Sequence, residues 1–139
     1  MRGRMLVLAI ALAGLAGCAP ESPVRTGGNV VTYPITIHRW LGIGSCVVNF
    51  SRDTIKVRRN WTVRFEMHNN CGSDYSVGIT DKDGLFTQSS QPVNVPANGT
   101  ATLPLTVKSS GINDGQHYKC DVLFKGANHD PDFEVEPGG

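Results

Sequence analysis

The sequence predicts an all-β protein whose main unit is an antiparallel β-sandwich. Apolar and polar residues alternate with a period of two through most of the chain beyond residue 30, which is typical of half-buried strands. Gly, Pro, Asn and Asp residues separate these stretches at short intervals and indicate turns. No stretch beyond residue 30 has the apolar spacing of an amphipathic helix. With 139 residues, the chain has the length of one ordinary domain.

The first segment, residues 1–17, predicts a signal peptide. Arg2 and Arg4 give it a basic start, and its apolar run is shorter than the about 20 residues that a transmembrane helix needs. The run ends in Leu-Ala-Gly-Cys at 15–18, which resembles the lipobox of bacterial lipoproteins. This resemblance implies that the chain is cleaved before Cys18 and that Cys18 is acylated and becomes the new N-terminus. An ordinary secretory signal with a chance cysteine is the alternative.

Residues 18–30 predict a flexible tether that starts at the lipidated Cys18. The segment is rich in Pro, Glu, Ser, Thr and Gly and has few apolar residues to bury. Two or three acyl chains would hold the protein at a membrane, because each buried CH₂ group contributes about 0.8 kcal/mol. Ala19 follows the cysteine where an Asp would favour the inner membrane, so by resemblance to enterobacterial lipoproteins we expect the outer membrane and a domain that faces the periplasm.

Residues 31–137 predict the sandwich, with seven to eight strands. Alternation is clearest at 61–68, where one face is apolar and the other charged. Pro104 argues that its strand lies at a sheet edge, because proline cannot donate a ladder hydrogen bond. The acidic residues at 130–136 favour a solvated edge strand that like charges protect from further pairing. The alternating stretches are 33–38, 46–50, 55–68 with a polar break at 59–60, 75–79, 93–95, 101–107, 118–124 and 133–135.

The order of these motifs resembles the cupredoxin-like domains. Residues 50–57, then 61–65 and Asn69, are similar to the family's Phe-x-Pro-x-x-Ile-x-Val strand, its Val-x-Phe strand and the Asn that ends it. Val-Pro-Ala-Asn-Gly-Thr at 95–100 resembles the family's Val-Pro-x-Gly-Thr turn, and 118–122 and 133–135 resemble its closing strands. The resemblance implies a Greek-key sandwich over about residues 35–136.

The ligand pattern of a blue-copper site departs from this family. Such a site needs two imidazoles and a thiolate, with a weak axial ligand. Tyr75 and Ser76 stand where the resemblance would place the first His, and no Met follows Cys120. We therefore expect no cofactor and no metal site. The weak candidates that remain for metal binding are His117, Cys120 and His129, joined by Met67 if the protein handles copper.

Apart from Cys18, the chain has three cysteines, Cys46, Cys71 and Cys120. An odd number in an oxidising compartment predicts one disulfide and one free thiol, and the sequence leaves all three pairings open. The disulfide would stabilise the domain by about 2–4 kcal/mol. We expect the remaining thiol to be buried and inert, since a free cysteine usually behaves as a small core residue.

No motif predicts catalysis, so we expect that the protein is not an enzyme. Asp-Lys-Asp-Gly at 81–84 is interpreted as a turn, because the later ligands of a calcium loop do not follow in register. The Ser-centred motif at 42–46 lacks the strand-to-helix setting of a nucleophile elbow.

The function we predict is that of an envelope-anchored lipoprotein whose β-sandwich is a non-catalytic binding or structural module. Its expected partners are the membrane, through the lipid anchor, and an envelope protein. Nucleic acid is not expected, because 13 Lys and Arg residues are balanced by 12 Asp and Glu residues. The alternatives are a periplasmic copper-binding or copper-carrying protein and an inhibitor of an envelope-targeting enzyme.

Overall fold

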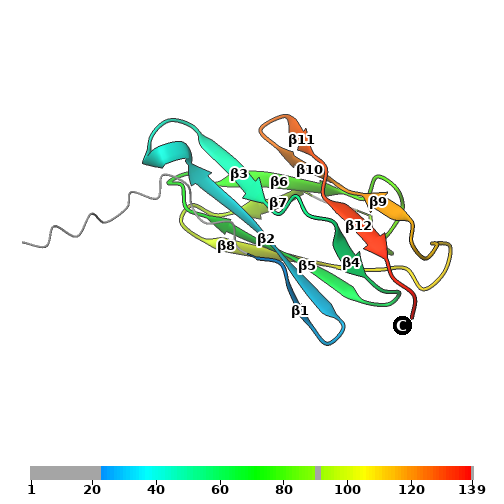
Figure 1. Ribbon diagram of the computed structural model, residues 1–139. Coiled ribbons are helices and arrows are strands. Elements are labelled where there is room, and N and C mark those ends of the chain that lie inside the picture. Colours follow the sequence, from blue (N-terminus) through cyan, green and yellow to red (C-terminus); the bar gives the residue numbers. More distant parts are fainter. Residues whose placement is uncertain (1–22, 90–91, 139) are drawn as a thin grey trace, which may run out of the picture.

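Figure 1 shows the computed structural model of the protein, which describes residues 23–89 and 92–138. The predicted signal peptide 1–17, Cys18 and the start of the predicted tether lie outside the described residues. No helix in the described part is long and apolar enough to cross a membrane. In chain order the elements are β1 (Arg25–Gly27), β2 (Val30–Arg39), the 3-10 turn η1 (Trp40–Gly42), β3 (Cys46–Phe50), β4 (Ile55–Val57), β5 (Thr62–Asn69), β6 (Tyr75–Thr80), β7 (Pro92–Val95), β8 (Thr100–Thr106), β9 (His117–Lys119), β10 (Asp121–Phe124), β11 (Ala127–His129) and β12 (Asp132–Val135).

The strands form three sheets around one apolar core, so the predicted all-β sandwich is confirmed. The first sheet has the order β1-β2-β5-β8, with β3 paired to β2; the others have the orders β11-β10-β6-β7 and β4-β12-β9. Aromatic rings join the first sheet to the third: the centroid of Phe133 lies 5.9 Å from that of Tyr33 and 6.3 Å from that of Phe65. All three side chains are fully buried.

The prediction that the sandwich is antiparallel was wrong for two strand pairs. β2 runs parallel to β5, and β4 runs parallel to β12. Alternation of apolar and polar residues reports which face of a strand is buried, and it carries no information on the direction of the neighbouring strand. The parallel neighbours are far apart in the sequence, where turn signals give no guidance.

The described residues contain more strands than the seven to eight predicted, because β1 and β11 were not predicted and because two predicted stretches each divide between sheets. The stretch 55–68 breaks at Asn60, whose φ of 64° turns the chain from β4 in the third sheet to β5 in the first. The stretch 118–124 breaks at Cys120, where β9 passes into β10 of the second sheet. Both breaks leave the alternation of buried residues nearly intact. The polar residues at 59–60 indicate the first break, whereas the alternation gives no sign of the second.

The β-structure begins before the predicted domain boundary at residue 31. Arg25–Gly27 pairs with the start of β2 through a hairpin in which Gly28 has a φ of 59°. The end of the predicted tether is therefore a strand. Although the segment has almost no apolar residues to bury, its backbone can satisfy the unpaired N–H and C=O groups at the edge of β2.

Two expectations about sheet edges had different outcomes. Pro104 lies in β8, which is the last strand of the first sheet, as predicted. The acidic strand β12, predicted as an edge, lies in the middle of the third sheet between β4 and β9. Its carboxylates face cationic and hydroxyl partners on both neighbours, so like-charge protection is not their role.

Candidate functional site

The candidate metal ligands occupy different environments. Met67 and Cys120 are fully buried in the core. His129, on β11, meets the ring of Phe50 edge-on at a centroid distance of 5.4 Å. His117, on β9, is exposed and is hydrogen-bonded to a carboxylate of β12. Within the described ranges, no group of three or more His, Cys, Asp or Glu residues could hold a metal ion.

Cys120 is the free cysteine of the described domain, and its surroundings keep the thiol protonated. Burial raises the pKa of the thiol far above its ordinary range, and the negative charges of Asp81, Asp121 and Asp83 raise it further. A metal ligand or a nucleophile must be the thiolate. Burial and the nearby carboxylates thus disfavour the thiolate, and Cys120 packs as a small core residue.

The other two cysteines form the disulfide Cys46–Cys71, one of the three pairings that the sequence left open. Cys46 begins β3, and Cys71 follows the end of β5. Next to the bond, the side-chain amide of Asn69 donates to the carbonyls of Ser73, Val95 and Pro96, and its oxygen accepts from the backbone N–H of Cys71. The disulfide and Asn69 together tie the loops at one end of the sandwich, called the disulfide end below.

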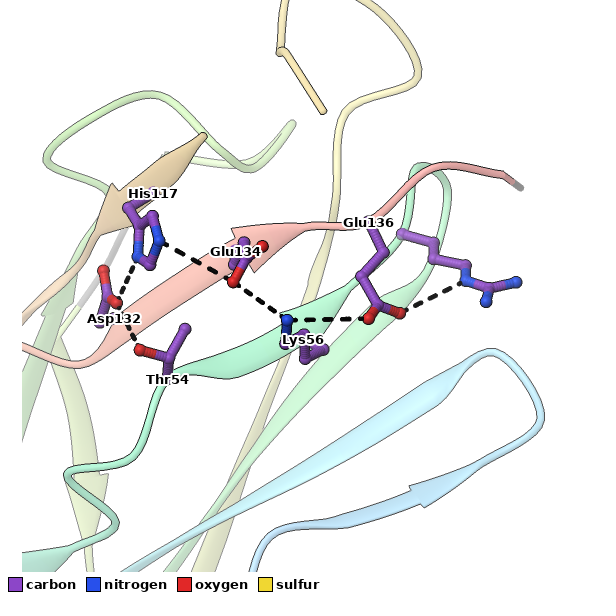
Figure 2. Close-up of polar contacts among 7 residues, drawn as sticks. Thr54, Lys56, His117, Asp132, Glu134 and Glu136 are labelled. Carbon is purple, nitrogen blue, oxygen red and sulfur yellow. Dashed lines mark hydrogen bonds and ion pairs between the residues drawn. The ribbon is translucent and has the colours of Figure 1, made fainter. Parts of the chain in front are cut away.

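The strongest cluster of polar side chains is a ladder across β4, β12 and β9, shown in Figure 2. Asp132 Oδ2 accepts hydrogen bonds from Thr54 Oγ1 at 2.8 Å and from His117 Nδ1 at 2.7 Å. Lys56 Nζ lies 3.1 Å from Glu134 Oε2 and 4.0 Å from Glu136 Oε1. Arg58 continues the row, with its Nε 3.8 Å from Glu136 Oε2. These residues define the β12 ladder.

Asp132 is the most constrained member of the β12 ladder. Partial burial, the largest single influence, raises the pKa of its carboxyl, and the hydrogen bonds from His117 and Thr54 lower it. The charges of His117 and Lys119 act in the same direction, so the pKa is lowered overall. The second oxygen, Oδ1, is inaccessible to solvent and accepts no hydrogen bond, although Lys119 Nζ lies 3.9 Å away. Asp132 thus stays ionised and holds three strands together.

The geometry of the β12 ladder does not form a nucleophilic triad. In a triad the hydroxyl bonds to the imidazole, which removes its proton. Here the hydroxyl of Thr54 and the ring of His117 both donate to the same carboxylate oxygen. What the ladder offers is a row of alternating positive and negative groups in which the basic side chains are exposed and the carboxylates are half-buried, and such a row suits recognition by charge complementarity.

An open groove borders the β12 ladder. It has a volume of about 610 Å³ and is lined by the segments 23–26 and 51–56. Thr54 and Lys56 belong both to the groove and to the ladder. The groove and the ladder therefore form one continuous surface at which a partner could contact charged and apolar groups together.

Sequence reasoning missed most of the β12 ladder. The sequence predicts an acidic edge strand at 130–136 and gives no role to Thr54, Lys56 or Arg58. The available signal was a match between two spacings. Lys56 in β4 and Arg58 just after it are two residues apart, as are Glu134 in β12 and Glu136 just after it, and Lys56 lies directly opposite Glu134. Using that signal requires knowing that these strands, far apart in sequence, are parallel neighbours.

Comparison with known proteins gives structural likeness alone. No family model matches the chain, and no curated protein matches it. A multicopper oxidase from Pediococcus acidilactici has a TM-score of 0.47 and 11% identity, covering 88% of this chain and 31% of its own. The McoA multicopper oxidase from Aquifex aeolicus has a TM-score of 0.47 and 12% identity, covering 85% of this chain and 32% of its own. Rusticyanin from Thiobacillus ferrooxidans has a TM-score of 0.44 and 13% identity, covering 81% of this chain and 86% of its own.

The chain spans about a third of the length of the multicopper oxidases it matches.

Proposed function

We propose that the protein is a lipoprotein of the bacterial cell envelope, anchored through Cys18, whose β-sandwich faces the periplasm as a non-catalytic binding module. The observation that carries the envelope location is the Cys46–Cys71 disulfide. Structural disulfides persist in oxidising compartments outside the cytoplasm. A leader with a basic start and an apolar run that ends at Cys18 supplies the route to such a compartment.

The roles of the candidate ligands favour binding over copper carriage. Cys120 is a buried, protonated core residue. His117 is engaged with Asp132 in the β12 ladder, and His129 packs on Phe50. Each of these side chains already contributes to holding the sandwich together, and recruiting them to one metal ion would break separate contacts.

The proposed binding surface is the β12 ladder with its adjoining groove. Charges of both signs alternate along the ladder, which suits another protein better than the uniformly negative backbone of a nucleic acid. The predicted partner is therefore an envelope protein with a complementary row of charges.

The lipid anchor is tested by expressing the full chain with its leader in a bacterial host supplied with labelled palmitate. We expect the label on the wild type, in the membrane fraction, and its loss in Cys18→Ser. Cys120→Ala is the matched control, because it removes a cysteine that is not acylated, and it should retain the label. An unlabelled wild type, or a labelled Cys18→Ser variant, would overturn the proposal.

Copper carriage is tested on the mature protein in detergent by titration with Cu(I) and Cu(II), with thiols counted before and after unfolding. We expect one thiol that reacts only in the unfolded protein, and no stoichiometric binding. Tight one-to-one binding that protects this thiol from reagent in the unfolding assay would instead support the copper-carrying alternative.

A further inference from the structure

The loop between β2 and β3 exposes three large apolar side chains. Trp40 is 56% exposed, Leu41 55% and Ile43 70%. In the described part of the chain, Leu123 is the one other large apolar residue with comparable exposure, at 43%. A local concentration of this kind on a small domain indicates a surface that another apolar phase covers.

The loop is held in a defined shape that projects these side chains. Leu41 has a φ of 52°, a left-handed conformation that is costly for a side chain with a Cβ. The backbone N–H of Ile43 donates to the carbonyl of Trp40, and Arg39 Nη1 donates to the carbonyl of Gly44 at 3.3 Å. β2 and β3 pair up to Arg39 and Cys46, where the disulfide fixes the base of the loop.

Basic groups flank the apolar tip. Arg39 precedes it and is exposed. Lys125, also exposed, lies in the hairpin between β10 and β11 and donates from Nζ to the carbonyl of Cys46 at 3.2 Å. An apolar tip with Trp, flanked by cationic side chains, has the composition of segments that insert into the headgroup region of anionic membranes.

The direction of the N-terminal segment indicates what covers the apolar tip. β1 is antiparallel to β2, with Gly27 opposite Val30 and Arg25 opposite Thr32. Toward lower residue numbers, β1 therefore runs toward the loop at 40–43, which forms one end of the molecule in Figure 1. The segment from Cys18 to Arg25 has the same number of residues as the part of β2 from Thr32 to Arg39. In an extended chain, this number of residues spans about 23 Å. The chain between them is long enough for an acylated Cys18 to lie level with Arg39.

We infer that the loop at 40–43 inserts into the same membrane leaflet that holds the lipid of Cys18. This inference rests on the proposed lipid anchor. The acyl chains and the loop then form two contacts with the membrane at the disulfide end. Because the tether links them, the acyl chains hold the loop at a high effective concentration near the bilayer. The domain stands on the membrane in one orientation, with the β12 ladder directed away from the bilayer.

The test uses the fluorescence of the two tryptophans in the full, acylated chain. The protein is reconstituted in vesicles of phosphatidylethanolamine and phosphatidylglycerol whose acyl chains carry bromine, a contact quencher. Trp61→Phe leaves Trp40 as the reporter, and Trp40→Phe leaves Trp61, which precedes β5 at the opposite end and lies under Arg58. We expect at least a twofold loss of Trp40 emission relative to vesicles without bromine, and almost no loss for Trp61.

The outcomes separate the inference from the proposed anchor. Vesicle flotation of both variants establishes anchoring independently of quenching, and protein that does not float contradicts the anchor itself. Floating protein in which Trp40 is quenched no more than Trp61 overturns the insertion of the loop. If Trp61→Phe fails to fold, the difference in quenching between the wild type and Trp40→Phe gives the Trp40 contribution.

Discussion

At the scale of single residues, Asp132 shows how one carboxylate determines the junction of three strands. It lies in β12, and its Oδ2 accepts from Thr54, which directly precedes β4, and from His117 at the start of β9. Hydrogen bonds to an ionised group contribute about 1.5–3 kcal/mol, more than those between neutral groups. The third sheet is therefore sensitive to the protonation of this one side chain.

The ionised form of Asp132 should stabilise the protein in a defined pH window. Because the folded protein lowers the pKa of this carboxyl, its contribution is full above the unfolded value of about 3.9 and is lost as the pH falls through the lower folded value. We expect the free energy of unfolding of the wild type to fall between about pH 5 and pH 2. Asp132→Asn should be less stable near pH 6 by about 1–2 kcal/mol and should lose less on acidification.

Urea unfolding followed by circular dichroism across this pH range measures both quantities. Asp53→Asn is the matched control, since Asp53 is exposed and belongs to the same end of β4. The control should follow the wild-type pH profile. An unchanged profile for Asp132→Asn would contradict the role assigned to Asp132.

At the scale of elements, the sequence predicted where strands lie far better than how they pair. The alternation at 61–68 correctly placed β5, and Pro104 correctly placed β8 at a sheet edge. The same alternation continued through the corner at Cys120, where β9 and β10 separate into different sheets. Side-chain periodicity is a local property, whereas sheet membership depends on neighbours distant in the sequence.

The candidate site was harder to predict than the fold for a related reason. The residue types of the metal candidates were visible in the sequence, and their spacing departs from that of a blue-copper site. The β12 ladder depends on the parallel register that sets Lys56 opposite Glu134, and a single sequence does not contain that register. The apolar loop residues Trp40, Leu41 and Ile43 could be read either as core or as surface until their exposure was known.

The disulfide should matter most for the elements at its own end. It closes a loop with a sequence separation of 25, which in the chain-entropy treatment stabilises the fold by about 3.5 kcal/mol. We expect the double variant Cys46→Ala and Cys71→Ala to lose about this much in urea unfolding. Cys120→Ala should lose about 1 kcal/mol, because it leaves only a small cavity. A double variant no less stable than Cys120→Ala would mean that the disulfide does not constrain the unfolded chain.

At the scale of the whole molecule, the two ends of the sandwich differ in character. The disulfide end combines the exposed apolar loop at 40–43 with Arg39 and Lys125. The opposite end, where the C-terminal segment lies in Figure 1, has charged turns such as the ion pair between Arg59 and Asp114. This asymmetry fits a domain that rests one end on a membrane and presents the other to the periplasm.

The segment from Cys18 to Arg25 matches the length of β2 from Thr32 to Arg39, and this match gives the last prediction. Inserting roughly a dozen Gly and Ser residues after Ala19 adds about 20 Å of root-mean-square reach and lowers the effective concentration of the loop at the bilayer. We expect the acylated variant to float with vesicles as the wild type does, while quenching of Trp40 by brominated lipid falls. Replacing residues 20–22 by Gly and Ser at unchanged length is the control and should preserve quenching. If the insertion leaves Trp40 fully quenched, the loop binds the membrane by its own affinity, and the length of the tether has no part in orienting the domain.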